Sequence, residues 1–199
     1  FKKTQFIFEL ALPHIGEEIA FYLSCPQKLE EAMQKSVHGF YPTAHIEKVK
    51  DYNIFSPKGV SSGGYFRQRK SHILPLKTYQ NLETNPLENI ANALSRLEKE
   101  GEGAALQIII AHAGAKWKNL GLRVARKMQE GRGFESARKS EGFFGQIIEI
   151  LKAGKKKKQE ENRGMEQKKP ITPLQEEIIK AIEGKTSKLG FLTNIRILV

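Results

Sequence analysis

The stretch EGKTSK at residues 183–188 contains Gly-Lys-Thr, the last three letters of the phosphate-binding loop of many ATPases. That loop has the pattern G-x-x-x-x-G-K-[ST] and lies between a strand and a helix, so that backbone N–H groups and the helix N-terminus bind the phosphates. The first glycine of the pattern would stand at position 179, where this sequence has Ile179. The stretch therefore lacks the glycine that turns the backbone toward a triphosphate.

The residues around Gly-Lys-Thr also stand in the wrong order for such a loop. Apolar residues upstream recur at helical spacing, and the run LGFLTNIRILV downstream predicts a strand. The order is helix, Gly-Lys-Thr, strand, which is the reverse of a phosphate-binding loop. We interpret Gly184 as the C-cap of the helix, with Lys180 and Lys185 near its negative end.

Few other residues have the types and spacing needed for catalysis. The five histidines show no metal-ligand spacing, and the sequence contains neither CxxC nor HExxH. A small enzyme that uses Glu100, Glu102 or Cys25 stays an alternative hypothesis, although no base, metal ligand or oxyanion-stabilising group accompanies them. We therefore expect this chain to have no catalytic residues, no cofactor and no metal.

The chain is basic, and one segment carries most of the excess. Its formal net charge is +11, with 33 Lys and Arg against 22 Asp and Glu. Residues 115–169 hold 16 basic and 7 acidic side chains, whereas residues 1–114 are nearly balanced, with 13 and 12. Such a segment suits nucleic acid or an anionic membrane surface. A solvated connector without a partner is the other interpretation of the same charges.

Within the basic segment, residues 117–131 predict an amphipathic helix. Trp117, Leu120, Val124 and Met128 recur on one face, which leaves the charges on the other. This arrangement predicts contact with phosphates without recognition of bases. The candidate contacts with nucleic acid or an anionic surface are Lys116, Lys118, Arg123, Arg126, Lys127, Lys155, Lys156, Lys157 and Lys158.

Hydrophobic periodicity predicts the elements that position these residues. The clearest helix start is at Asn85, a good N-cap, followed by Pro86, which suits the first helical position. The patterns predict strands within 5–24, over 44–55, over 65–79 and over 105–113, and helices over 26–39, 86–97, 117–131, 142–154 and 173–183.

This order mixes strands and helices without regular βαβ crossovers. It predicts an α+β fold with an antiparallel or mixed sheet covered on one face by helices, and a ferredoxin-like arrangement is the leading candidate. We expect an α+β domain at 1–114, a basic helical extension at 115–151 and a charged flexible linker at 152–170. Residues 171–199 would begin a second, similar unit that is cut short.

Several sequence blocks together are similar to a known family. They are FELALPHIGEEIAFYLSCP, HGFYP, DYNIF, LPLKTY, NPLENIANALSRLEKEGEGAALQIII and KLGFLTNIRILV. In this order they resemble the N-terminal, non-ATPase region of bacterial ATPases of type IV secretion and conjugative DNA transfer, within the FtsK/HerA superfamily. The resemblance covers roughly residues 4–114 and 171–199, and EGEGAALQIII is its most specific part.

The resemblance implies a non-catalytic assembly and DNA-handling module of such an ATPase. The implied partners are a C-terminal ATPase domain of the same longer chain, DNA, the membrane surface through a preceding segment, and further copies in a homo-oligomer. No run of about 18 apolar residues occurs, and the lone Cys25 suits a reducing compartment. We therefore expect a cytoplasmic location at the inner face of the cell membrane. The alternative is a stand-alone protein that binds the phosphate backbone of nucleic acid through residues 115–169.

Overall fold

The computed structural model describes residues 4–13, 18–50, 52–55, 58–78, 81–97, 103–140 and 170–199. The chain forms two compact units, which we call the sheet unit and the helical unit. The sheet unit contains Phe1–Arg67, Lys77–His112 and Phe191–Val199, and the helical unit contains Gln68–Leu76 and Ala113–Gly190.

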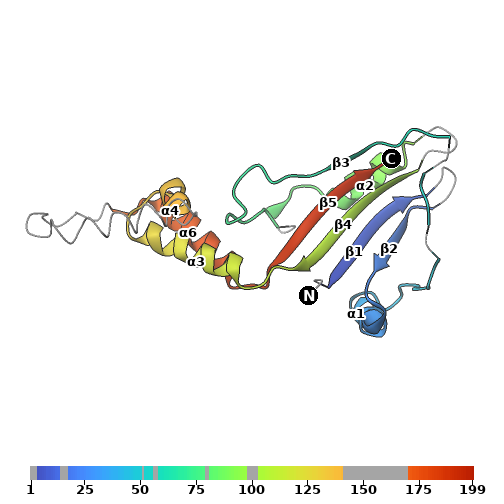
Figure 1. Ribbon diagram of the computed structural model, residues 1–199, viewed down its shortest axis with the longest axis horizontal. Coiled ribbons are helices and arrows are strands. Elements are labelled where there is room, and N and C mark those ends of the chain that lie inside the picture. Colours follow the sequence, from blue (N-terminus) through green and yellow to red (C-terminus); the bar gives the residue numbers. More distant parts are fainter. Residues whose placement is uncertain are drawn as a thin grey trace, which may run out of the picture. The chain divides into compact units, whose positions relative to one another are not determined.

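The sheet unit is built on five antiparallel strands in the order β2-β1-β4-β5-β3 (Figure 1). The central strand of this order is almost entirely apolar, as expected for a strand that is covered on both faces. The strands are β1 (Gln5–Leu12), β2 (Ala20–Ser24), β3 (Gly63–Tyr65), β4 (Ala104–His112) and β5 (Phe191–Leu198).

One face of the sheet is covered by helix α2 (Pro86–Leu94). The Asn85 side chain accepts a hydrogen bond from the Leu87 N–H at 3.1 Å, which satisfies one of the free donors at the helix start. The helix buries Leu94 against Leu10 and Leu106, which are partners in the β1–β4 register. The expected N-cap and proline position of this helix are therefore confirmed.

A second, smaller cluster lies on the other face of the sheet. Ala11 and Ala105, also partners in the β1–β4 register, pack there against Ile54. Small side chains on the two strands leave room for the segment 52–55 to lie close to the sheet. The ring of Tyr52 stacks on Tyr22 of β2, with ring centroids 4.2 Å apart.

Helix α1 (Glu30–Phe40) follows a 3-10 turn, η1 (Gln27–Leu29). None of its residues is buried. It continues through Gly39, so the expectation that this glycine ends the helix is wrong. A glycine without a positive φ angle is compatible with a helix interior, and Gly39 has none.

The helical unit packs α3 (Lys116–Gln129), α4 (Phe134–Ser140) and α6 (Pro173–Thr186) around one core. Val124 and Met128 of α3 and Ile182 of α6 are completely buried, and each such side chain stabilises the fold by about 1.5–3 kcal/mol. Thr172 and Gln175 form a capping box at the start of α6.

A glycine allows α3 and α6 to approach closely. A Cβ atom at Gly121 would stand 2.5 Å from Cγ2 of Thr186, which is closer than carbon atoms approach without a shift. The helices therefore meet where one has no side chain and the other has a small one. The Thr186 hydroxyl is satisfied within its own helix by the carbonyls of Ile182 and Glu183, at 2.9 and 3.0 Å.

Most of the helical unit, residues 113–190, lies between β4 and β5 in the chain, whereas its segment 68–76 lies between β3 and α2. The chain leaves the sheet after His112 and returns to it at Phe191. At the base of the helical unit, the Ala113 N–H donates to the Gly190 carbonyl at 3.0 Å. The indole of Trp117 lies over Gly190, since a Cβ atom there would be 2.1 Å from the ring.

The α+β class and the antiparallel sheet are confirmed. The order of elements differs from the expected ferredoxin-like order. A ferredoxin-like unit runs β-α-β-β-α-β, whereas here β2 follows β1 directly and pairs with it. The expected start of a second unit at 171–199 is corrected. Strand β5 pairs with β4 of the first sheet, and α6 packs on α3 rather than opening a new domain.

The expected separation of 115–151 from 171–199 is corrected, because α3 and α4 share a core with α6. The flexible linker expected at 152–170 lies outside the described residues except for Pro170, so it stays a prediction. Residues 141–169 lie outside the described residues, including the helix expected at 142–154. Two strand predictions are wrong: the described residues of 44–55 form no strand, and of the strand expected over 65–79 only Tyr65 belongs to β3.

We predict that Gly121→Ala lowers the free energy of unfolding by about 1–3 kcal/mol, because the new methyl group overpacks against Thr186. Thermal unfolding followed by circular dichroism measures this. Gly184→Ala is the matched control in α6, where an added Cβ meets nothing within 4 Å. It should raise stability by about 0.5–1 kcal/mol, because alanine favours a helix over glycine.

The double variant Gly121→Ala/Thr186→Ser removes the methyl group that causes the clash and should recover most of the loss. Equal stability of Gly121→Ala and the unchanged chain would contradict the close approach of the two helices.

Candidate nucleic-acid interface

Three of the predicted contact residues lie together on one exposed face of α3. Lys116, Arg123 and Arg126 are separated by seven and three residues, steps that return to nearly the same side of a helix. All three are exposed, whereas Val124, Ala125 and Met128 on the other side are buried. We call Lys116, Arg123 and Arg126 the basic face of α3.

The other two predicted residues of this helix are placed differently. Lys118 is half-buried and stands about 200° around the helix from Lys116. Lys127 is buried, and its ammonium donates to the Ser140 hydroxyl of α4 at 2.9 Å. The prediction that Lys127 is a surface contact is therefore wrong, because α4 packs on α3 at this position and its Ser140 accepts a hydrogen bond from the ammonium. Lys155, Lys156, Lys157 and Lys158 lie outside the described residues.

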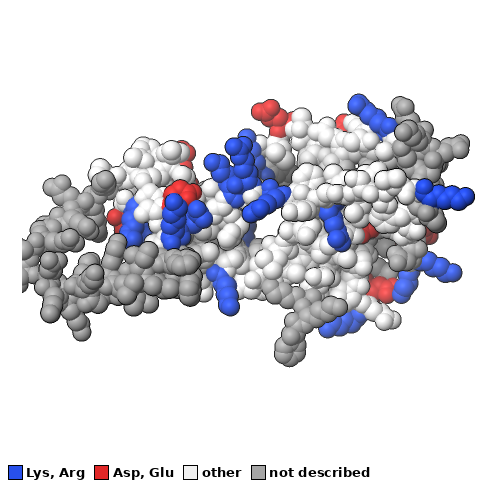
Figure 2. All heavy atoms as spheres, turned by 45° about the horizontal axis from the view of Figure 1, so that its top comes forward, with Lys and Arg blue, Asp and Glu red and all other residues white. Residues whose placement is uncertain are grey.

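The charge balance of the helical unit favours an anionic partner. Its described residues include 13 Lys and Arg against 5 Asp and Glu. One of these acids, Glu135, is engaged by Arg138 of the same helix at 2.8 Å, and this hydrogen bond lowers the pKa of Glu135. Among the described residues, Lys116 and Arg126 have no carboxylate within ion-pair distance. Basic side chains project over the visible face, and acidic ones are sparser (Figure 2).

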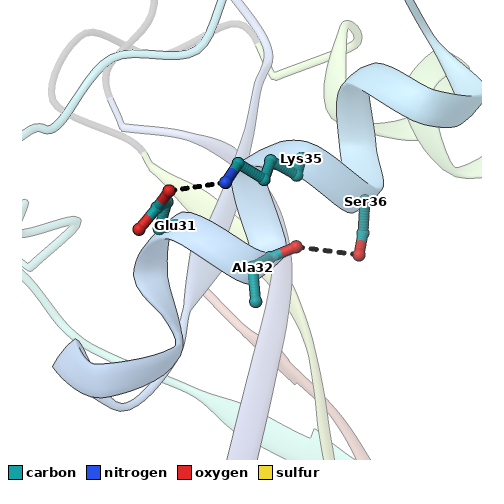
Figure 3. Close-up of polar contacts among 4 residues, drawn as sticks. All are labelled: Glu31, Ala32, Lys35 and Ser36. Carbon is teal, nitrogen blue, oxygen red and sulfur yellow. Dashed lines mark hydrogen bonds and ion pairs between the residues drawn. The ribbon is translucent and has the colours of Figure 1, made fainter.

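The exposed helix of the sheet unit makes a useful contrast. On α1, the Lys35 ammonium pairs with Glu31 at 2.6 Å, and the Ser36 hydroxyl donates to the Ala32 carbonyl at 2.8 Å (Figure 3). Glu30 at the start of the same helix pairs with Lys48 at 3.0 Å. Lys35 and Lys48 thus have carboxylate partners beside α1, whereas Lys116 and Arg126 of α3 have none among the described residues.

The Gly-Lys-Thr stretch is the last turn of α6 and not a loop. Lys185 donates to the backbone carbonyls of His72 and Leu74, the latter at 3.0 Å, and Thr186 is buried. Burial lowers the pKa of the Lys185 ammonium from 10.5. The helix continues to Thr186 with Ser187 as its C-cap, so the prediction of Gly184 as the C-cap is wrong. None of the three residues is arranged to cradle a phosphate.

The remaining candidates for chemistry are not brought together. Cys25 is a half-buried free thiol after β2. Glu100 and Glu102 lie outside the described residues. In the part of the chain that the structure describes, no group of three or more His, Cys, Asp or Glu side chains could hold a metal ion. Nor does any helix in that part have the length and hydropathy of a membrane span.

The structure also brings together polar side chains that the sequence analysis missed. Glu9, Gln107 and Arg196 come from β1, β4 and β5 and are cross-strand partners. Gln107 donates to the Glu9 carboxylate, and the Arg196 Nε–H donates to the Gln107 carbonyl at 2.5 Å. Each is the polar exception in an apolar run, in FIFEL, ALQIII and IRIL. A polar residue in an apolar run could have marked each of them in the sequence. That the three lie close together depends on which strands pair.

Comparison with known proteins assigns the family. The chain belongs to the DUF8128 family. This family, described as a domain of unknown function, matches residues 3–199, so the DUF8128 domain includes both the sheet unit and the helical unit. No curated protein and no solved structure matches the chain.

Replacing Lys185 of this DUF8128 chain by Met should lower the free energy of unfolding by about 1–2 kcal/mol. The carbonyls of His72 and Leu74 then lose a charged donor. Chemical denaturation at neutral pH measures the change. Lys180→Met, an exposed position of the same helix, should change stability by less than about 0.5 kcal/mol.

The same pair of proteins gives a pH test. Because folding lowers the pKa of Lys185, the unfolded chain holds this proton more tightly than the folded chain. The stability of the unchanged chain relative to Lys185→Met should therefore rise as the pH increases from the folded pKa toward 10.5. A relative stability that falls over this interval would contradict the burial of the ammonium.

Proposed function

We propose that this domain is a non-catalytic assembly and DNA-handling module, and that the basic face of α3 binds the phosphate backbone of nucleic acid. The observation that carries the proposal is the exposed row of Lys116, Arg123 and Arg126 on a rigid helix, within a unit where basic side chains greatly outnumber acidic ones. Cations held at fixed spacing on a helix suit the regular charges of a nucleic-acid backbone.

The start of α3 supports a binding role for its cations. Lys116 and Lys118 lie in the first turn, which contains no acidic residue. The positive end of the helix dipole disfavours cations there by about 0.3–1 kcal/mol each. Helix stability therefore does not account for two lysines at these positions, and an anionic partner would offset their cost.

Base recognition is not part of this proposal. Trp117, the only tryptophan of the chain, lies over Gly190 and is half-buried. Its ring is thus engaged within the helical unit, and α3 has no other aromatic residue to stack on a base. Contacts between cations and phosphates fix position on a backbone without selecting a sequence.

The resemblance to the N-terminal region of type IV secretion and conjugation ATPases supplies the setting for the proposal. In that setting the domain acts in the cytoplasm at the inner face of the cell membrane, as part of a homo-oligomer. A motor domain of the same longer chain hydrolyses ATP, and this domain positions DNA for it. The arrangement of Gly-Lys-Thr within α6, away from any phosphate cradle, supports a non-catalytic role for this part of the chain.

The backbone-binding proposal predicts a specific change in salt dependence. Binding to a fluorescent DNA duplex is measured by anisotropy between about 50 and 200 mM salt. Each phosphate neutralised contributes about 0.9 to the slope of log K against log salt, so Lys116→Ser/Arg126→Ser should flatten the slope by about 1.8.

The control is Lys28→Ser/Lys50→Ser, which removes two exposed cations of the sheet unit and changes the net charge equally. Its slope should match that of the unchanged chain. If both double variants flatten the slope to the same extent, binding follows net charge and the basic face of α3 is not the site. If the chain does not bind the duplex even at the lowest salt, the proposal is wrong and the basic segment is a solvated connector without a partner.

The non-catalytic part of the proposal is tested with ATP. The purified chain should show no more phosphate release than buffer in a coupled assay, because the Gly-Lys-Thr residues form the last turn of α6 and do not cradle a triphosphate. Turnover that is typical of motor ATPases and is abolished by Lys185→Met would show that the Gly-Lys-Thr stretch is a nucleotide site after all.

A further inference from the structure

A row of polar and aromatic side chains crosses the whole sheet. Tyr22, Glu9, Gln107, Arg196 and Tyr65 are successive cross-strand partners in β2, β1, β4, β5 and β3. Directly opposed residues in a sheet project from the same face, so the five side chains share one face. Leu10 and Leu106 pack against α2, and each is adjacent in sequence to a member of the row, Glu9 or Gln107. Because successive residues of a strand point to opposite faces, the row lies on the face opposite to α2.

Hydrogen bonds along this row fix the orientation of Arg196. The Glu9 carboxylate can only accept, and it receives hydrogen bonds from the Tyr52 hydroxyl and the Gln107 side-chain N–H. The Gln107 amide must therefore turn its NH₂ group toward Glu9 and its carbonyl toward Arg196. That carbonyl accepts the Arg196 Nε–H at 2.5 Å, which holds one edge of the guanidinium.

The other edge of the guanidinium is left for a ligand. A guanidinium carries five N–H donors, and the protein uses the one on Nε. Within the described residues, the donors on the two terminal nitrogens meet no protein acceptor, and no carboxylate lies within ion-pair distance. These terminal nitrogens have the geometry for a two-pronged contact with a phosphate.

A hollow of about 250 Å³ lies beside Arg196. On the β3 side it is bordered by Gly63, a position that shares the face of Tyr65 and has no side chain to fill the space. Tyr65, the cross-strand partner of Arg196, is 74% exposed at the edge of the sheet. The hollow is lined by Gly63, Gly64, Tyr65, Asn194, Arg196 and Leu198.

We propose that this hollow binds single-stranded nucleic acid. The terminal nitrogens of Arg196 contact a backbone phosphate, the exposed ring of Tyr65 stacks on a base, and the Asn194 amide offers a donor and an acceptor to the base edge. A cation and an exposed aromatic ring side by side are the pair of groups that single-strand sites use. A duplex does not suit the hollow, because its bases are stacked inside and no base face is free for Tyr65.

This site is separate from the basic face of α3. It belongs to the sheet unit, whereas α3 belongs to the helical unit. It also differs in chemistry, because α3 offers charges to any phosphate backbone and the hollow requires an unpaired base. The two sites can therefore fail or succeed independently in an experiment.

The test compares oligothymidylate of about 12 nucleotides with a duplex of equal length, by fluorescence anisotropy at one salt concentration. Tyr65→Leu should weaken binding of the single strand about tenfold and leave duplex binding unchanged, since a leucine side chain cannot stack on a base. Arg196→Lys keeps the charge but loses the two-pronged contact with phosphate. It should therefore also weaken binding of the single strand and leave binding of the duplex unchanged.

The matched control is Tyr41→Leu, which removes an aromatic ring that is 69% exposed elsewhere on the sheet unit. It should bind both DNAs as the unchanged chain does. Thermal unfolding of every variant separates binding from folding, and Tyr65→Leu, at an exposed position, remains informative if Arg196→Lys does not fold. The variant Lys116→Ser/Arg126→Ser should weaken binding of both DNAs. Failure of the α3 proposal is therefore distinguishable from failure of the proposal for the hollow.

Two outcomes would overturn the proposal. If Tyr65→Leu binds oligothymidylate as tightly as Tyr41→Leu does, the ring takes no part in binding. If Arg196→Lys abolishes binding of a peptide with a free C-terminal carboxylate while Tyr65→Leu does not, and oligothymidylate is unaffected by both, the hollow is a carboxylate site for a protein partner.

Discussion

The antiparallel pairing of β4 with β5 is the interaction on which the sheet and the polar row depend. Its register runs from Ala105 opposite Leu198 to His112 opposite Phe191, and it joins strands separated by the whole of residues 113–190. The entropy of closing a loop grows only with the logarithm of its length, so a long insertion adds little to the cost of this pairing. Eight pairs of residues on mainly apolar strands are available to offset it.

The pairing also creates the polar row. Arg196 reaches Gln107 only because β5 lies beside β4, and Tyr65 reaches Arg196 only because β3 pairs with β5. Glu9 is connected to Arg196 through a neutral amide rather than by direct contact. The carboxylate therefore orients the guanidinium without occupying the nitrogens that would meet a ligand.

Local patterns allowed the local elements to be predicted, and they failed where distant residues decide the structure. Asn85 and Pro86 indicated the start of α2, and the apolar run near Leu106 indicated the central strand. The run FLTNIRIL was correctly expected to be a strand, but its sequence does not specify a partner. A strand that opens a new sheet and a strand that completes an old one have the same alternation, which is why residues 171–199 were assigned to a second unit.

The candidate sites show the same difference between local patterns and contacts among distant residues. The basic face of α3 could be predicted, because helical spacing alone places Lys116, Arg123 and Arg126 together. Lys127 could not be excluded from it, because its burial depends on α4 and on the hydroxyl of Ser140. The hollow beside Arg196 was beyond prediction, since its lining comes from β3 and β5, which are far apart in the sequence.

The hydrogen bond between Ala113 and Gly190 holds the two ends of residues 113–190 next to each other. Ends this close are the geometry that tolerates insertion of one domain into another. A short turn between β4 and β5 would therefore keep their register if residues 113–190 were removed. The segment 68–76 would then lose its packing partners, because Ile73 lies in the core that α3 and α6 form.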